Sequence, residues 1–209
     1  MMNDTDAHCH IIPSAPCPEM LAGCICNATT QSEWEKFCAT SDDKTFACIG
    51  IHPWQIETIT PNWANELYNT LVNNPCLMVG EIGMDKYHAN LDTQAEIFIT
   101  QLKIASELNR PAHIHCVGAW DKLLHIFKTH KAHMPPFVLF HRYSGNPGDI
   151  VRLADEYNAY FSYRDIDMIL LNATPRDRIL IETDSNNPSH IVEISHAFAM
   201  VCPDTDFHT

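Results

Sequence analysis

Positive charge is scarce in this sequence. It has 13 Lys and Arg residues against 26 Asp and Glu residues, a formal net charge of −13 at pH 7. Tight, non-specific binding of nucleic acid depends on neutralising phosphates with Lys and Arg, so this balance argues against it. Carboxylates gathered around a bound cation would account for part of the acidic excess.

Long apolar runs are also lacking. None reaches the roughly 18 residues that a membrane-spanning helix needs. The first ten residues, MMNDTDAHCH, contain neither the basic nor the apolar segment of a secretory signal. We therefore expect no membrane contact and a cytoplasmic protein. The apolar content of 45% is ordinary for a globular chain, and 209 residues fit a single domain over residues 1–209.

Disulfides are not indicated, although the sequence contains nine cysteines. The number is odd, and the chain is too long for the small disulfide-rich class. The spacing of Cys24 and Cys26 is neither a zinc-knuckle nor a redox spacing. We expect the cysteines within apolar runs to be buried as small hydrophobic side chains and assign no chemistry to them; these are Cys9, Cys24, Cys26, Cys48, Cys76 and Cys116.

Short apolar runs alternate with amphipathic stretches along the chain. The runs lack clean alternation of apolar and polar residues, as expected of strands buried on both faces of a parallel sheet. The clearest helix covers residues 91–109, with Asn90 as its cap, and two more are predicted over 120–130 and 189–201. The predicted strands are 5–10, 22–28, 45–51, 76–82, 112–116, 137–141, 159–163 and 178–183.

Eight predicted strands that alternate with helices indicate a compact (β/α)8 TIM barrel. The segment after the first strand, IIPSAPCPEML, contains three prolines and is too broken for a full helix. We therefore expect the first crossover helix to be reduced or missing. A complete barrel usually has about 250 residues, so this barrel is a shortened one.

Several side chains that can bind metals fall at the ends of these strands. His8 and His10 are two residues apart on a strand and point to the same face. In a barrel the carboxyl ends of the strands converge on one mouth, and charged groups there need partners such as a metal ion. Any single histidine could be a core residue, but chance does not explain the whole set, which continues with Glu81, His115, His141 and Asp184.

The ordered motifs DAHCHI, GIHPW, VGEIGMD, PAHIH, HRYSG and RILIETD resemble those of the TatD-type metal-dependent deoxyribonucleases, within the amidohydrolase-like barrels. The resemblance covers about residues 6–201. It implies that His8 and His10 bind one metal, that His115 and His141 bind a second, and that Glu81 bridges the two. It also implies that Asp184 is a ligand that orients or deprotonates the attacking water, which makes Glu81 and Asp184 the catalytic residues.

The implied cofactor is one or two divalent metal ions. A mixed set of imidazoles and carboxylates suits Zn²⁺, Mn²⁺ or Fe, and less obviously Mg²⁺. Water bound to such an ion loses its proton near neutral pH and becomes a nucleophile. The resemblance therefore implies hydrolysis of phosphodiester bonds in DNA without a covalent enzyme intermediate, with single-stranded DNA or 3′ ends as a weakly bound partner.

Three further residues are candidate substrate contacts. His52 of GIHPW could bind a phosphate or leaving group, or could serve the turn with Pro53. Asp85 could hydrogen-bond a ligand imidazole or cap a loop. Tyr143 lies in a loop whose aromatic residue could stack on a nucleobase.

The chain also departs from the family pattern. Its first crossover is broken, Asp184 is followed almost at once by the Asn187–Pro188 element, and the tail after the last helix is short. These changes remove parts of a rim that would grip a polymer, and a second subunit could cover the opened surface. Two alternatives therefore stay open: a hydrolase of a small phosphoester, amide or lactone, and a barrel kept as a binding or assembly module. The intact ligand set argues against the second.

Overall fold

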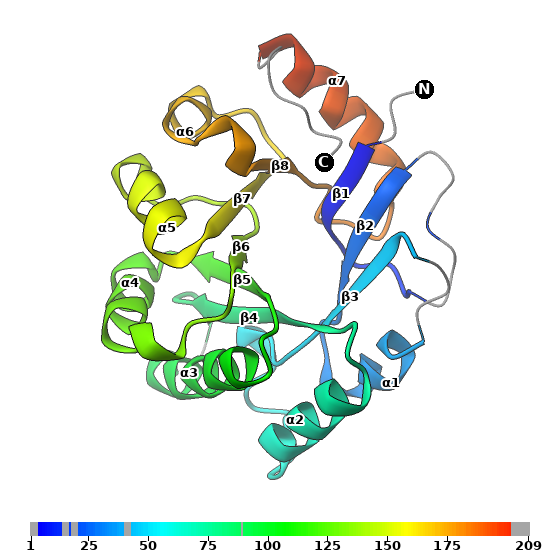
Figure 1. The fold of residues 1–209 in the computed structure, drawn as a ribbon, viewed down its shortest axis with the longest axis vertical. Helices are drawn as coiled ribbons and strands as arrows, with labels where there is room; N and C mark the ends of the chain where they lie inside the picture. Colours follow the sequence, from blue (N-terminus) through cyan, green and yellow to red (C-terminus); the bar gives the residue numbers. More distant parts are fainter. Residues whose placement is uncertain (1–3, 14–16, 18–20, 40–42, 89, 202–209) are drawn as a thin grey trace.

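The computed structural model describes residues 4–13, 17, 21–39, 43–88 and 90–201. Its eight parallel strands follow one another in chain order around a nearly closed barrel (Figure 1). The predicted barrel is confirmed. The strands are β1 (Asp4–Cys9), β2 (Leu21–Asn27), β3 (Thr45–Ile49), β4 (Met78–Asp85), β5 (Ala112–Val117), β6 (Val138–Phe140), β7 (Ala159–Tyr163) and β8 (Ile179–Ile181).

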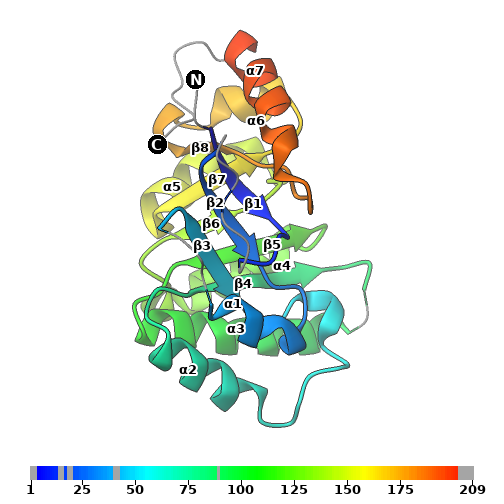
Figure 2. The ribbon, with the colours of Figure 1, turned by 90° about the vertical axis from the view of Figure 1, so that its right-hand side faces the viewer.

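Helices lie on the outer side of β4 to β8 (Figure 1), whereas Figure 2 looks onto β1, β2 and β3, in front of which little helix is drawn. The predicted helices correspond to α3, α4 and α7, and the Asn90 side chain accepts a hydrogen bond from the Thr93 N–H at the start of α3. In the described ranges no helix is long and apolar enough to cross a membrane. The helices are α1 (Trp34–Phe37), α2 (Trp63–Asn73), α3 (Leu91–Glu107), α4 (Trp120–Thr129), α5 (Ile150–Tyr157), α6 (Met168–Ala173) and α7 (Ile191–Val201).

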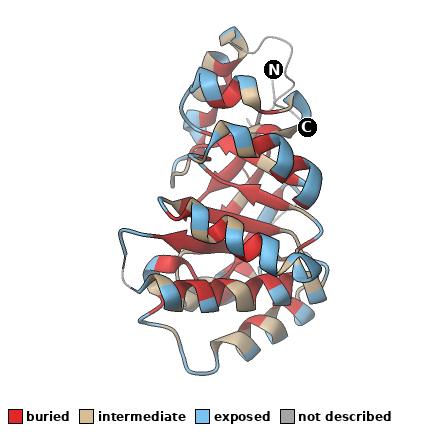
Figure 3. Cartoon of the chain, turned by 90° about the vertical axis from the view of Figure 1, so that its left-hand side faces the viewer, coloured by how far each residue is buried: buried red, intermediate tan, exposed pale blue. Residues whose placement is uncertain are grey.

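Buried side chains line both the strands and the sheet-facing sides of the helices (Figure 3). Between α4 and the strands, aromatic rings form much of this core: Phe127 packs on Phe140 and Phe140 stacks on Phe161. These contacts join α4 to β6 and β6 to β7.

The helical cover is thinner over the first three strands. The described residues between β1 and β2, which are 10–13 and 17, form no helix, whereas 14–16 and 18–20 lie outside the described residues. The second crossover is also short, because α1 has only four residues. The sequence did not predict this second reduction. A 3-10 turn, Gln31–Glu33, precedes α1, and the Glu33 carboxylate caps this turn by accepting the N–H groups of Thr29 and Thr30.

Two details of β4 differ from the prediction. Glu81 does not end the strand, because β4 continues to Asp85. This extension depends on Gly83, at φ +148°, where a Cβ atom would lie 1.9 Å from the carbonyl oxygen of His115. Only glycine allows β4 to approach β5 so closely. Cys76 was expected in the strand, but a turn from Asn74 to Leu77 precedes β4 and leaves Cys76 exposed.

The barrel closes between β1 and the chain that follows β8. The Asp184 N–H donates to the His8 carbonyl at 2.9 Å, and the His10 N–H donates to the Ser185 carbonyl at 3.0 Å. The fully buried Asp6 carboxylate joins the same two segments, because it accepts the Thr183 hydroxyl at 2.6 Å and the Thr183 N–H at 3.0 Å. This closure places His8 and His10 beside Asp184.

We expect Asp6→Ala to lower the free energy of unfolding by about 2–4 kcal/mol, because it leaves buried donors of Thr183 and His8 without an acceptor. Urea denaturation followed by circular dichroism measures this as a lower midpoint at an unchanged m-value. Thr183→Val removes only the hydroxyl and should cost about 1 kcal/mol. Equal losses in the two variants would contradict a closure that depends on the carboxylate.

Candidate metal centre

Two imidazoles and a carboxylate meet where β1 and β8 end. The Nε2 atoms of His8 and His10 lie 3.2 Å apart, and Oδ1 of Asp184 lies 3.2 Å from the second of these nitrogens. Two nitrogen ligands bound to one ion at about 2.0–2.1 Å are separated by roughly 3.0–3.4 Å. The spacing of these donors therefore fits a single divalent ion.

Glu81 lies between this group and a second one. Its Oε2 is 3.4 Å from Nε2 of His8, whereas its Oε1 faces the second group: 2.7 Å from Nδ1 of His115, 2.8 Å from Nε2 of His141 and 3.3 Å from Nε2 of His52. Its side chain is almost completely buried. One carboxylate is thus positioned to be shared by both groups of donors.

The charge of Glu81 is stabilised by its neighbours. Burial alone would raise the pKa of its carboxyl group, but the charges of His141, His52 and His8 outweigh burial and hold that pKa well below its usual value. The same attraction raises the pKa of His141 well above its usual value against the effect of burial. Glu81 is therefore ionised in the folded protein, which is the form that binds a metal ion.

Asn27, at the end of β2, contacts the Nδ1 atom of each of three histidine rings. Its amide nitrogen is 3.2 Å from Nδ1 of His8, its backbone oxygen is 3.2 Å from Nδ1 of His10, and its amide oxygen is 2.7 Å from Nδ1 of His113. Contacts to Nδ1 leave Nε2 of His8 and His10 directed at the centre. The sequence does not predict this role of Asn27, because nothing in its local pattern marks it.

Glu182 supports the other side of the centre. Its carboxylate accepts the Arg142 N–H at 2.9 Å and the Ser162 hydroxyl, and it lies 3.7 Å from Nδ1 of His141. At 3.7 Å this carboxylate makes no hydrogen bond to the ring, but its negative charge helps to raise the pKa of His141. Glu182 was also missed, although it stands two residues before Asp184 in the motif RILIETD.

His52 lies closer to the donors than the prediction placed it. It follows β3 by three residues and caps the turn Pro53–Gln55, with Nδ1 accepting the Trp54 N–H at 3.2 Å. One donor atom from each of His52, Glu81 and His115 lies within 4.8 Å of the others. The residue thus combines the expected turn contact with a position among the candidate ligands.

Asp85 forms the loop cap that the sequence left open, whereas its distance from the nearest candidate ligand imidazole exceeds a hydrogen bond. One carboxylate oxygen accepts the Tyr87 N–H at 2.9 Å and so caps the loop. The other accepts the indole N–H of Trp54 at 2.8 Å and lies 3.7 Å from Nε2 of His115. Asp85 therefore caps the loop after β4 and places its carboxylate near the imidazole of a candidate ligand.

The position of Tyr143 does not match the expected nucleobase contact. Its side chain is buried, with its ring packed edge-on against Trp120 and Phe161 and its hydroxyl donating to the Asn146 carbonyl at 2.9 Å. The chain turns inward after β6, so the ring completes the core rather than facing the centre. In this position the Tyr143 ring offers no exposed face to a base in the cleft.

A cleft of about 990 Å³ opens above the two donor groups. Trp54 lines it with a side chain that is 53% exposed and stacked on the His88 ring at 4.6 Å. Among the described lining residues, Arg142 is the only lysine or arginine, and its guanidinium lies 3.0 Å from Oδ2 of Asp184. Arg142 and Asp184 both adopt left-handed backbone conformations, with φ near +45°, of the strained kind that clusters at functional sites.

The fold and this centre define a (β/α)8 barrel with candidate metal-binding imidazoles and carboxylates gathered at the carboxyl ends of its strands. The chain belongs to the TatD related DNase family, which it matches over residues 5–190.

Similar proteins include nucleases from distant organisms. The chain is 30% identical to the 3′-5′ ssDNA/RNA exonuclease TatD of Klebsiella pneumoniae (strain 342), over 67% of this chain and 57% of that protein. It is 25% identical to the human 3′-5′ RNA nuclease TATDN2, over 86% of this chain and 28% of that protein. The structure of YJJV, a TatD homologue from Escherichia coli K12, superposes with a TM-score of 0.78 at 20% identity, covering 96% and 90% of the two chains. The chain thus spans little more than half of the Klebsiella relative.

We expect Asn27→Leu to weaken binding of Mn²⁺ or Zn²⁺ by about 10–100-fold, since loss of a group that orients ligand imidazoles has effects of this size. Titration calorimetry measures the affinity, and near-ultraviolet circular dichroism verifies the fold. The matched control is Asn186→Leu, because Asn186 lines the same cleft. Unchanged affinity in the Asn27 variant would show that the rings need no support from β2.

Proposed function

We propose that this protein is a metal-dependent nuclease that hydrolyses phosphodiester bonds of single-stranded nucleic acid, with DNA as its preferred substrate. The observation that carries the proposal is the shared position of the buried Glu81 between two groups of candidate ligands. Membership of the TatD related DNase family and the nuclease names of two relatives support it.

In this proposal each donor group holds one divalent ion. His8, His10 and Asp184 form the first group, His115 and His141 form the second with His52 beside them, and Glu81 joins the two. Zn²⁺ and Mn²⁺ suit these donors best. A bound ion of this kind supplies an activated water and stabilises charge on a phosphoryl oxygen.

Asp184 is the residue that we assign to the attacking water. Burial would raise the pKa of its carboxyl group, but the hydrogen bond to His10 and the charges of His8 and His141 outweigh burial and lower it. A carboxylate with a low pKa stays ionised and is a weak base. Asp184 therefore acts mainly by accepting a hydrogen bond from the water and directing it at the phosphorus atom, with no covalent enzyme intermediate.

The walls of the cleft fit a single strand better than a duplex. The exposed Trp54 ring offers a surface on which an unpaired base can stack. The sequence had indicated Tyr143 for this role. Arg142 is the cationic side chain available to a phosphate there. With so few cations the protein would neutralise few phosphates, so we expect weak binding that depends little on salt.

The decisive experiment is cleavage of an end-labelled single-stranded oligonucleotide with Mg²⁺, Mn²⁺ or Zn²⁺. We expect metal-dependent cleavage that falls below detection in Glu81→Gln and Asp184→Asn, while Asp155→Asn, on an exposed residue of α5, keeps wild-type activity. The product ladder separates exonuclease from endonuclease action, and an RNA strand of the same sequence tests the preference for DNA.

A second candidate is hydrolysis of small phosphoesters by the same centre. The net charge of −13 and the near absence of lysine and arginine from the described cleft walls favour it. Turnover of mononucleotide phosphoesters that exceeds turnover of oligonucleotides would replace the nuclease proposal. Near-wild-type activity of either ligand variant in metal-replete buffer would show that the assigned centre is wrong.

We expect Arg142→Ala to raise KM for an oligonucleotide by about 10–100-fold, the effect of losing a hydrogen bond to a charged group. Arg142→Lys should restore part of this loss, because lysine keeps the charge but not the two-pronged geometry. Steady-state kinetics separate two roles of this residue. A fall in kcat at constant KM would mean that Arg142 acts only by positioning Asp184, which lies 3.0 Å away.

A further inference from the structure

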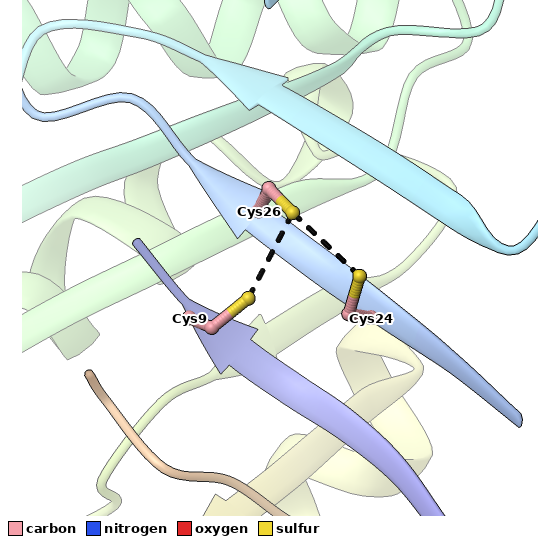
Figure 4. Close-up of side chains that lie close together, drawn as sticks. All are labelled: Cys9, Cys24 and Cys26. Atoms are coloured by element: carbon pink, nitrogen blue, oxygen red, sulfur yellow. Dashed lines mark hydrogen bonds between the residues drawn. The ribbon is translucent and has the colours of Figure 1, made fainter. Parts of the chain in front are cut away.

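Three cysteine thiols meet in the wall of the barrel (Figure 4). The sulfur of Cys26 lies 3.8 Å from that of Cys9 and 3.8 Å from that of Cys24, and all three sulfurs lie within 4.8 Å of one another. None of the three side chains is exposed. The group joins two strands, because Cys9 belongs to β1 and pairs in register with Cys26 of β2.

This group, which we call the thiol cluster, faces away from the centre described above. Residues alternate sides along a strand, so Cys9 points opposite to His8 and His10. On β2, Asn27 reaches His8, and Cys24 and Cys26 therefore project from the other side. The thiol cluster shares no residue with the candidate hydrolytic centre.

The spacing of the sulfurs matches that of thiolate ligands on one ion. Zinc binds cysteine sulfur at about 2.3 Å, and tetrahedral geometry then separates two sulfurs by about 3.8 Å. Two of the three sulfur pairs have this separation. A disulfide needs about 2.05 Å, so no pair is positioned for one without movement. The present arrangement suits a shared ion better than an S–S bond.

A fourth sulfur is available from the segment between the two strands. Cys17 is buried, and its thiol hydrogen-bonds that of Cys24. Four thiolates form a closed structural zinc site, and such sites stabilise the fold outright. Thiolate ligands also offset the charge of a divalent ion that burial would otherwise make costly.

We propose that Cys9, Cys24 and Cys26 bind one zinc ion through their thiolates, with Cys17 as the fourth ligand. The ion has a structural role in this assignment. It fastens β1 to β2 and to the segment between them, where the described residues 10–13 and 17 form no helix. It thereby supplies contacts that a crossover helix makes elsewhere in the barrel.

Cobalt substitution tests the proposal on the full chain. The candidate hydrolytic centre offers only nitrogen and oxygen donors, so a sulfur-to-cobalt charge-transfer band reports the thiol cluster alone. We expect this band in the wild type after anaerobic loading with Co²⁺, and its loss in Cys24→Ala/Cys26→Ala. Cys48→Ala is the matched control, because Cys48 is equally buried and lies outside the cluster, and should keep the band.

X-ray absorption at the zinc edge gives a second readout that needs no cysteine variant to fold. In protein carrying Asp184→Asn and His10→Ala, we expect the retained zinc to show sulfur neighbours at about 2.3 Å. Removal of this zinc should lower the melting temperature of the wild-type protein. Zinc without sulfur neighbours, a band that persists in the double cysteine variant, or free thiols that bind no cobalt would each overturn the proposal.

Discussion

A carboxylate without access to water constrains the whole interior of the barrel. Glu81 is 2% exposed, and an ionised carboxylate is too costly to bury alone. It is compensated by imidazoles contributed by four other strands or their carboxyl-terminal loops, which lie 2.7–3.4 Å away. Those distances require the strands to be in the register observed. The close approach of β4 and β5 at Gly83 is part of the same requirement.

The strands and the positions of the candidate metal ligands could be predicted because both follow local rules. Buried parallel strands produce apolar runs, and the ends of such runs converge wherever the barrel closes. Contacts between distant segments follow no such rule. Asn27 meets His113 across 86 residues, and Glu182 meets the chain after β6 across 40. Tyr143 shows the same limit, since only the path of the chain decides whether an aromatic ring after a strand faces the cleft or the core.

Stability is distributed unevenly around the barrel. Strands β4 to β7 are backed by α3, α4 and α5 with an aromatic core, whereas in the described part of the chain α7 contacts β1 and the short α1 contacts β3 (Figure 1). On this side other interactions hold the wall. The Asp6 carboxylate joins β1 to the chain after β8, and the thiol cluster lies between β1 and β2. The thin side also contains His8 and His10, so its stability bears directly on the centre.

One strand thus presents two chemically different donor sets on its two faces. His8 and His10 offer nitrogen toward the interior, while Cys9 between them offers sulfur on the opposite side. Thiolates select soft ions, whereas imidazoles with carboxylates also accept Mn²⁺. Zinc could therefore fill both sets, but manganese only the inner one. A protein with this arrangement could exchange the metal used in hydrolysis without losing the ion that stabilises its thinnest wall. Separation of the sets by strand alternation alone makes that independence possible.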